Sequence, residues 1–302
     1  MKKIILLFGP TASGKSEIAI DISRKLNGEI LNADSMQVYK EIKILSARPN
    51  KSNVKHHFYG FLSAKKSFSV GEWYKLAAKR IKEIQKRKKV PVVVGGTGLY
   101  FKALTDGLVN IPKVEKKDFS HLNPLGRWMM GNHYHKKNST IFDGVNMNDI
   151  QRVSRAISVY EGTGLTLKEW QSKKNKKYFK SKDFIKLCLS PPKDALEKKI
   201  KKRFNQMLKK GALNEVSKYK KKFLVPASYI SANSIIGIYE IDLYQQKSIN
   251  LNELKDRVLI RTRQYAKRQY TWQRGQMQDW KQFTDTNYLD LRKKILSYLS
   301  KT

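Results

Sequence analysis

The sequence predicts an α/β fold: a P-loop-type parallel sheet flanked by helices, with a small, mainly helical insertion domain and a helical C-terminal part. A phosphate-binding motif near the N-terminus joins an apolar run of strand length to a helical pattern. Strand-like runs and helical patterns then alternate to about residue 108, which is typical of a parallel sheet. After a last apolar run at residues 184–189, the remaining patterns are helical.

The first apolar run, residues 3–8, leads into a match to G-x-x-x-x-G-K-[ST], the P-loop motif. The motif reads Gly9-Pro10-Thr11-Ala12-Ser13-Gly14-Lys15-Ser16. A helical pattern follows, and the free N–H groups and dipole of a helix N-terminus attract phosphate. Lys15 is placed to reach phosphate oxygens, and Ser16 is placed to hold Mg²⁺. The motif predicts a polyphosphate or pyrophosphate ligand without saying which one binds.

A second strand is predicted at residues 29–34, next to the P-loop strand, and it ends at Asp34. Because ligands bind at the carboxyl ends of parallel strands, Asp34 is expected near the bound phosphates. Three roles stay open for it: a metal-linked carboxylate, a general base, or a turn-capping residue. Arg48 follows in an extended segment, where it either contacts phosphate or faces water.

Residues 73–85 are predicted to form a helix, residues 90–94 a buried strand, and residues 99–108 a further helix. The turn between the last two, residues 95–98, is a second glycine-rich strand-to-helix turn. It places Thr97 where its backbone and hydroxyl can face the same crevice.

The predicted domains are a catalytic core, residues 1–112 and 181–302, and an insertion at residues 113–180. Residues 113–147 lack strong periodicity, and residues 173–182 are expected to form a basic loop. Between them Asn148-Asp149 is expected to cap a helix that Gly162 and Gly164 end. Its polar face is suited to grip a phosphate of a nucleic-acid backbone. That face carries Gln151, Arg152 and Arg155.

In the C-terminal part, Asp194 is expected to cap a helix that ends at Gly211. A long helix is predicted at about residues 251–274, with Tyr265 and Trp272 among its buried side chains. Its other faces mix arginine and lysine with amides and aromatics, a combination typical of RNA contacts. The alternative is a solvated outer face with snorkelling lysines.

The formal net charge of +37, from 62 Lys and Arg against 25 Asp and Glu, points to a polyanionic partner, although part of it is expected to be a solvated, lysine-rich surface. The lone cysteine, Cys188, excludes an intrachain disulfide and a cysteine-rich zinc site. His121, His133 and His135 fit no standard metal spacing, so solvated or packed histidines are favoured. No membrane-spanning run is found, and we expect a cytoplasmic monomer that does not bind membranes.

Six segments together resemble the bacterial tRNA dimethylallyltransferases (tRNA isopentenyltransferases), in the order of that family and across the chain. The segments are residues 9–16, 32–40, 95–104, 148–156, 203–208 and 263–272. A P-loop alone occurs in many enzymes, whereas this series is specific to the family.

The resemblance implies transfer of a dimethylallyl group from dimethylallyl diphosphate to N6 of adenosine-37 in tRNAs reading codons that begin with U. The P-loop would hold the diphosphate, helped by Lys15, Thr97, Arg203 and a Ser16-bound Mg²⁺, and Asp34 would accept the N6 proton. The target adenine would leave the anticodon-loop stack. The partner would be the tRNA anticodon stem-loop. Implied tRNA contacts are Asp34, Ser35, Met36, Gln37, Thr97, Gln151, Arg152, Val153, Ser154, Arg155, Ser234 to Tyr239, Lys267, Arg268, Gln269, Tyr270, Thr271, Trp272, Gln273 and Arg274.

Two segments depart from the family pattern. Leu45-Ser46-Ala47-Arg48-Pro49 stands where Gly-Thr-Ala-[Lys/Arg]-Pro is expected, and Gly237-Ile238-Tyr239-Glu240 stands for Gly-Tyr-[Arg/Lys]-Gln. From the residues alone, two rivals stay open: an ATP-binding small-molecule kinase, and a non-enzymatic RNA-binding protein that uses the P-loop as a nucleotide switch.

Overall fold

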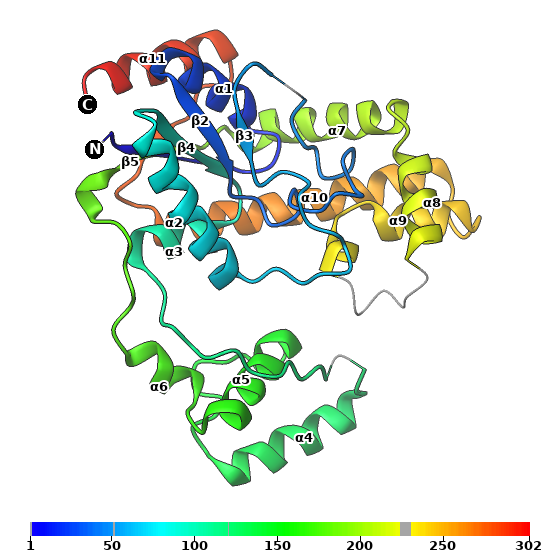
Figure 1. Cartoon of the computed structure of the whole chain (residues 1–302). Coiled ribbons are helices and arrows are strands. Elements are labelled where there is room, and N and C mark those ends of the chain that lie inside the picture. The colour runs from blue at the N-terminus through cyan, green and yellow to red at the C-terminus, as the bar shows by residue number, and fades with distance from the viewer. Residues whose placement is uncertain (1, 51, 120, 224–230) are drawn as a thin grey trace. The chain divides into compact units, whose positions relative to one another are not determined.

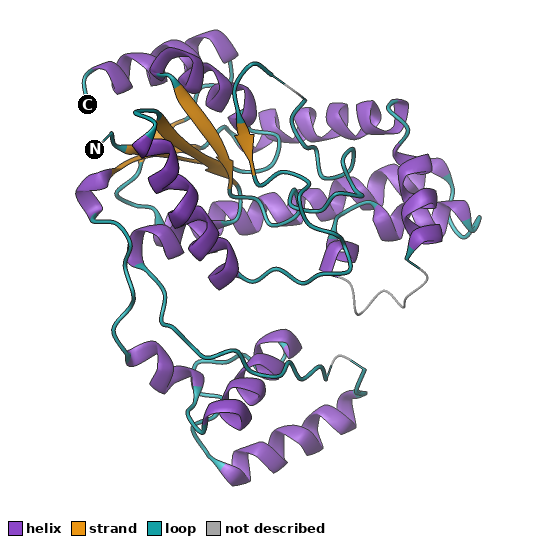
Figure 2. Ribbon diagram, viewed as in Figure 1, coloured by secondary structure: helices purple, strands orange, loops and turns teal. Residues whose placement is uncertain are grey.

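The structure is a computed structural model that describes residues 2–50, 52–119, 121–223 and 231–302. The chain forms two compact units (Figure 1). The first comprises Met1–Thr105 and Tyr178–Thr302, and the second comprises Asp106–Lys177. These limits lie a few residues from the expected boundaries, 112/113 and 180/181. In the described ranges, every strand belongs to the first unit (Figure 2).

The first unit is built on a six-stranded sheet with the order β3-β2-β4-β1-β5-β6. The strands are β1 (Ile4–Phe8), β2 (Gly28–Asn32), β3 (His56–His57), β4 (Val90–Gly95), β5 (Phe184–Leu189) and β6 (Lys281–Phe283). Each neighbouring pair is parallel, for example Ile5 opposite Val92 and Ile185. The expected parallel α/β fold is confirmed, and the carboxyl ends of the strands share one edge.

Helices cover both faces of the sheet (Figure 1). On one face α1 (Lys15–Leu26) and α11 (Tyr288–Ser300) pack onto alternate strand residues such as Ile5 and Leu7. On the other face lie α2 (Val70–Lys86) and α3 (Gly98–Asp106), and Phe101 of α3 meets Phe8 edge-on at 5.7 Å between ring centres. Strands buried on both faces explain the continuous apolar runs in the sequence.

The helices α7 (Lys193–Lys209), α8 (Ala212–Lys222), α9 (Ile238–Gln245) and α10 (Leu251–Gln276) build a second apolar core with residues 38–45. Short 3₁₀ turns lie at Ser181–Asp183 and Ser231–Ser234. One expected cap is wrong, because Pro192 and not Asp194 is the N-cap of α7. As expected, Gly211 lies just past the end of α7 in the left-handed region, with φ 93°, and it is also the N-cap of α8. Asp194 instead lies in the first turn of α7, where its charge favours the helix dipole.

The second unit contains α4 (Pro124–Lys137), α5 (Ile150–Thr163) and α6 (Leu167–Ser172). As expected, Asp149 caps α5 by accepting a hydrogen bond from the Arg152 N–H, and Gly164 ends it with φ 71°. Helices α4 and α6 were not predicted. In α4, buried Met130 and Tyr134 are opposed by exposed apolar side chains, so the sequence shows no clear helical period.

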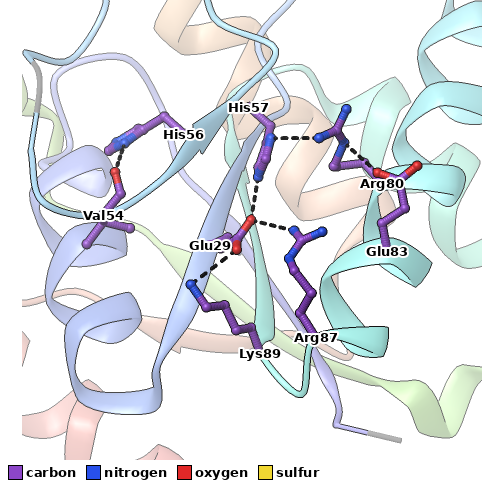
Figure 3. A network of polar contacts seen from close by, with 8 residues as sticks. All are labelled: Glu29, Val54, His56, His57, Arg80, Glu83, Arg87 and Lys89. Carbon is purple, nitrogen blue, oxygen red and sulfur yellow. Dashed lines mark hydrogen bonds and ion pairs between the residues drawn. The ribbon is translucent and has the colours of Figure 1, made fainter.

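A buried carboxylate anchors the amino edge of the sheet (Figure 3). Glu29 of β2 is 1% exposed and contacts His57 Nε2 at 2.7 Å, Arg87 at 2.8 Å and Lys89 at 3.3 Å. Burial alone would raise the pKa of Glu29, but these hydrogen bonds outweigh it and lower the pKa to about 2. Glu29 starts the strand whose other end leads to Asp34, so the cluster lies away from the phosphate-binding edge.

Candidate active site

Three strand ends meet at the carboxyl edge of the sheet. The expectation that the P-loop strand and the Asp34 strand are neighbours is wrong, because β4 lies between β1 and β2. Hydrogen bonds join the three ends: the Ala33 N–H donates to Val94 (2.8 Å), and the Gly9 N–H donates to Gly95 (3.3 Å). A Cβ on Gly95 would lie 2.0 Å from the Ala33 carbonyl oxygen, so this approach requires glycine.

The P-loop joins β1 to α1, as expected from the sequence. Ala12 and Gly14 have φ of 64° and 85°, and α1 begins at Lys15 without a side-chain cap. Its first N–H groups therefore remain for an anion. The Lys15 ammonium donates to the Pro10 carbonyl at 3.1 Å. Burial lowers the pKa of Lys15 to about 8, against the opposing charge of Asp34 and with a further lowering from Arg203.

Asp34 lies on the turn after β2, where its carboxylate accepts the Met36 N–H at 2.9 Å. Burial lowers the pKa of Arg203, and the Asp34 charge opposes that change, as it does at Lys15. Thr97 accepts the Ser35 N–H at 3.0 Å and so joins the turn after β4 to the turn after β2. The structure therefore brings Asp34 together with the basic groups that the sequence assigned to the same site.

Lys15, Asp34 and Arg203 line one cavity of about 1630 Å³ in the first unit, whereas Thr97 is not among its lining residues. Its lining contains all of residues 11–17, Asp34–Gln37 and Arg203. Nine lysines and arginines line it, against two acids, Glu17 and Asp34. Apolar side chains from residues 44–47, α7 and α10 complete the wall. The cavity is thus suited to a ligand that combines strong negative charge with an apolar part.

Helix α10 braces the P-loop and the turn after β4 through side chains spaced at i, i+4 and i+7. Gln269 is 4% exposed, accepts the Thr11 N–H at 2.8 Å and donates to the Gly96 carbonyl at 2.9 Å. Tyr265 lines the cavity and is hydrogen-bonded to Thr97, while burial and the Asp34 charge raise its pKa. The Trp272 ring lies where a Cβ on Gly98 would come within 2.2 Å. Our sequence prediction missed this bracing role, although the spacing itself marked one helical face.

Arg203 of α7 contacts the P-loop from another side, because its guanidinium donates to the Thr11 hydroxyl. Ser13 is 3% exposed, and its hydroxyl has no hydrogen-bond partner among the described residues. An unpartnered buried hydroxyl in a phosphate-binding loop leaves one more group available to an incoming ligand.

Seven residues expected to contact tRNA are buried, among them Ile235, Gly237 and Ile238. Val153 is fully buried in the core of the second unit, and the Ser154 hydroxyl accepts the Phe119 N–H at 3.3 Å. Gln269 is the brace described above, and Gln273 donates to Gln282 at 2.7 Å. Their side chains do not reach the surface in this structure. The exposed members of the expected set are Gln151, Arg152, Arg155, Ser234, Tyr239, Lys267, Arg268, Thr271 and Arg274.

Tyr270 and Trp272 are partly buried, and Tyr270 donates to the Pro191 carbonyl. Gln37 is held as well, since its amide donates to the Ser46 and Ala47 carbonyls at 3.0 and 3.1 Å. These side chains position the cavity wall in the structure. Contact with RNA at Ser35, Met36, Gln37 and Thr97 stays a prediction.

The two segments that depart from the family pattern pack together. Leu45 lies against Gly237, where an added Cβ would come within 2.9 Å of a leucine methyl, and the φ of 106° at this position favours glycine. Glu240 is 2% exposed, accepts the Gly237 N–H and pairs with Arg261 of the cavity wall. The carboxylate of Glu215 accepts three successive N–H groups at residues 43–45, at 2.7, 2.7 and 3.0 Å. The first departing segment, residues 45–49, therefore lines the cavity, and the second, residues 237–240, packs against it without lining the cavity itself.

Comparison with known proteins agrees with this geometry. Residues 37–276 match the family model described as IPP transferase. A tRNA dimethylallyltransferase of Pelagibacter ubique is 44% identical over 285 residues, covering 92% of this chain and 90% of the relative. One of Rickettsia felis is 38% identical and covers 92% of each.

Solved structures give the same result. A tRNA isopentenylpyrophosphate transferase from Bacillus halodurans aligns with a TM-score of 0.72 at 26% identity, covering 100% of this chain and 96% of that one. A eukaryotic dimethylallyltransferase acting on tRNA aligns with a TM-score of 0.75 at 28% identity, covering 90% of this chain and 70% of that one. The residues matched span both units, so the chain belongs to the IPP transferase family.

Proposed function

We propose that this protein is a tRNA dimethylallyltransferase. It transfers the dimethylallyl group of dimethylallyl diphosphate to N6 of adenosine-37, in tRNAs that read codons beginning with U. The proposal depends on one observation: Asp34, Lys15, Arg203 and the P-loop line the same basic cavity. The family match and relatives named for this reaction support it.

The reaction forms a bond between N6 and the first allylic carbon while the bond from that carbon to the diphosphate oxygen breaks. The electron pair leaves with diphosphate, so negative charge grows where the P-loop N–H groups, Lys15 and Arg203 lie. The Asp34 carboxylate takes the proton that N6 loses. The target adenine leaves the anticodon-loop stack to enter the cavity. Thr97 and Tyr265 hold the turn beside Asp34.

Mg²⁺ fits the donor set as a partner of the diphosphate. Mg²⁺ prefers oxygen ligands, and it is commonly bound by one or two protein oxygens together with substrate phosphates. Ser16 lines the cavity at the start of α1 and would hold the ion. The ion would neutralise part of the diphosphate charge.

The tRNA anticodon stem-loop is the proposed partner of exposed cations in both units. In the first unit these are Lys267, Arg268 and Arg274, and in the second Arg152 and Arg155. No helix in the described ranges is long and apolar enough to cross a bilayer. A cytoplasmic location and a monomeric state remain predictions.

The test incubates the protein with labelled dimethylallyl diphosphate, Mg²⁺ and unmodified tRNA. We expect label in tRNA that carries adenosine-37 and none in a transcript with guanosine there. An Asp34→Asn variant serves as the chemical control. The kinase rival is not favoured by the family match, and it would release phosphate from ATP without RNA. ATP turnover together with unlabelled tRNA would refute the proposal.

A further inference from the structure

The outer face of α4 carries three exposed apolar side chains that contact no core. Leu125, Trp128 and Met129 are 64%, 65% and 59% exposed. They lie at i, i+3 and i+4, so they share one helical face. Met130 and Tyr134, which are buried, hold the opposite face against the core of the second unit. The three exposed side chains therefore belong to a helix whose other side is well packed.

Trp128 stands out among these side chains. Of the five tryptophans, all in the described ranges, it alone is exposed, whereas Trp73 and Trp280 are buried and Trp170 and Trp272 are partly buried. An exposed indole costs free energy of hydration unless a ligand covers it. Its flat ring is suited to stack on another flat group.

The charge around this face selects the kind of ligand. Residues 119–142 contain three lysines and arginines, three histidines and no Asp or Glu. Among the cations, Lys136 lies two turns beyond Met129 on the same face. The Arg127 guanidinium instead donates to the Leu122 carbonyl at 2.9 Å, and the Lys137 ammonium lies over the Tyr134 ring. An exposed aromatic side chain with a cation on the same helical face, in a stretch without acidic residues, is suited to single-stranded nucleic acid through stacking on bases and attraction to phosphates.

We propose that Trp128 is a stacking platform for an unpaired nucleobase of the bound RNA, with Lys136 on the same helical face as a phosphate contact. The inference rests on the proposed function for the identity of the RNA, and it adds a contact outside the cavity. A protein partner or a second copy of the chain fits less well, because either would need an apolar patch larger than these three side chains. The lack of Asp and Glu in residues 119–142 also gives neither of them an advantage.

The experiment measures binding of the full chain to a labelled anticodon stem-loop and to a blunt RNA duplex of equal length, with no prenyl donor present. We compare Trp128→Ala with Trp128→Phe, which keeps a ring, and with Met129→Ala, which removes a neighbouring exposed side chain without a ring. Circular dichroism checks that each variant keeps its fold. Lys136→Ala measures the charge contribution through the salt dependence of Kd.

We expect Trp128→Ala to raise Kd for the stem-loop about 5- to 150-fold, the range that loss of one stacked base gives. Trp128→Phe and Met129→Ala should stay within about threefold of wild type, and duplex binding should not change. The salt slope should be unchanged in Trp128→Ala and about 0.9 shallower in Lys136→Ala.

Equal effects of Trp128→Ala on stem-loop and duplex, or no effect on either, would overturn the stacking role. A changed sedimentation coefficient with unchanged RNA affinity would assign the face to a protein contact instead, and would overturn it as well. Because these assays need no catalysis, they separate the two proposals. If the wild-type protein prenylates tRNA and Trp128→Ala leaves Kd unchanged, only the stacking inference is refuted. If Trp128→Ala raises Kd but the wild-type protein does not prenylate tRNA, only the proposed function is refuted.

Discussion

Removal of the Gln269 side chain is the sharpest test of how the phosphate-binding turn is built. The amide bridges the Thr11 N–H and the Gly96 carbonyl at 2.8 and 2.9 Å and is 4% exposed. In Gln269→Ala both groups lose their partner, and an unpaired buried polar group costs about 1–3 kcal/mol. We therefore expect the free energy of unfolding to fall by about 2–5 kcal/mol, and Kd for pyrophosphate to rise about tenfold as Thr11 loses its fixed position.

Gln273→Ala is the matched control, one turn further along α10 and 6% exposed. Its side-chain amide nitrogen donates to Gln282, away from the P-loop, and its amide oxygen has no partner among the described residues. Urea unfolding and calorimetric titration with pyrophosphate should show a smaller loss of stability and unchanged pyrophosphate binding. If both variants lose equal stability and neither changes pyrophosphate affinity, the bracing role of Gln269 is wrong.

Three further predictions concern titratable groups. Asp34→Asn should lower kcat by about a hundredfold or more, because the carboxylate acts as a base, while its Kd for tRNA stays within a few-fold of wild type. A near-wild-type rate in single-turnover assays would exclude that role. The pKa of Lys15 is about 8 in the free protein, so pyrophosphate affinity should fall above pH 8 as the ammonium deprotonates, by up to about tenfold per pH unit. Titration calorimetry should show this pH dependence of affinity in wild type and not in Lys15→Met. The pKa of Glu29, about 2 against 4.5 unfolded, stabilises the fold fully above pH 4.5, and this contribution is lost as pH falls toward 2. Glu29→Gln should therefore cost about 3 kcal/mol at pH 7, and a difference from wild type that does not shrink between pH 5 and pH 3 in urea unfolding would contradict the assignment.

Much of the sheet could be predicted from the sequence because local chemistry specifies it. The strands at residues 4–8 and 90–95 are buried throughout, and the run at residues 184–189 is buried except for the half-buried Ile185 and Lys186. The turns after β1 and β4 carry the glycines that their backbones require. The P-loop and the glycine-rich turn could therefore be placed at one edge before any coordinates. Asp34 could be placed there too, because it follows a strand.

The strand order could not be predicted, since a local pattern does not say which parallel strand lies beside which. Nothing near Asp34 shows that β4 separates it from the P-loop strand. Burial of Gln269 and Val153 also depends on distant partners, so polar and apolar residues in a promising motif were both assigned to the RNA. Helix α4 was missed because its outer face is as apolar as its inner one.

Helix α10 has a consequence for how this chain can vary over evolution. Its 26 residues are uninterrupted, and they place Tyr265, Gln269 and Trp272 at the strand ends while Arg263, Lys267 and Arg274 point to the outside. Insertion of one residue ahead of Tyr265 would rotate everything beyond it by about 100°. The glutamine brace would then leave the P-loop, and cations would turn inward. The length of this helix between Leu254 and Trp272 is therefore expected to be invariant among functional relatives, while its side chains change.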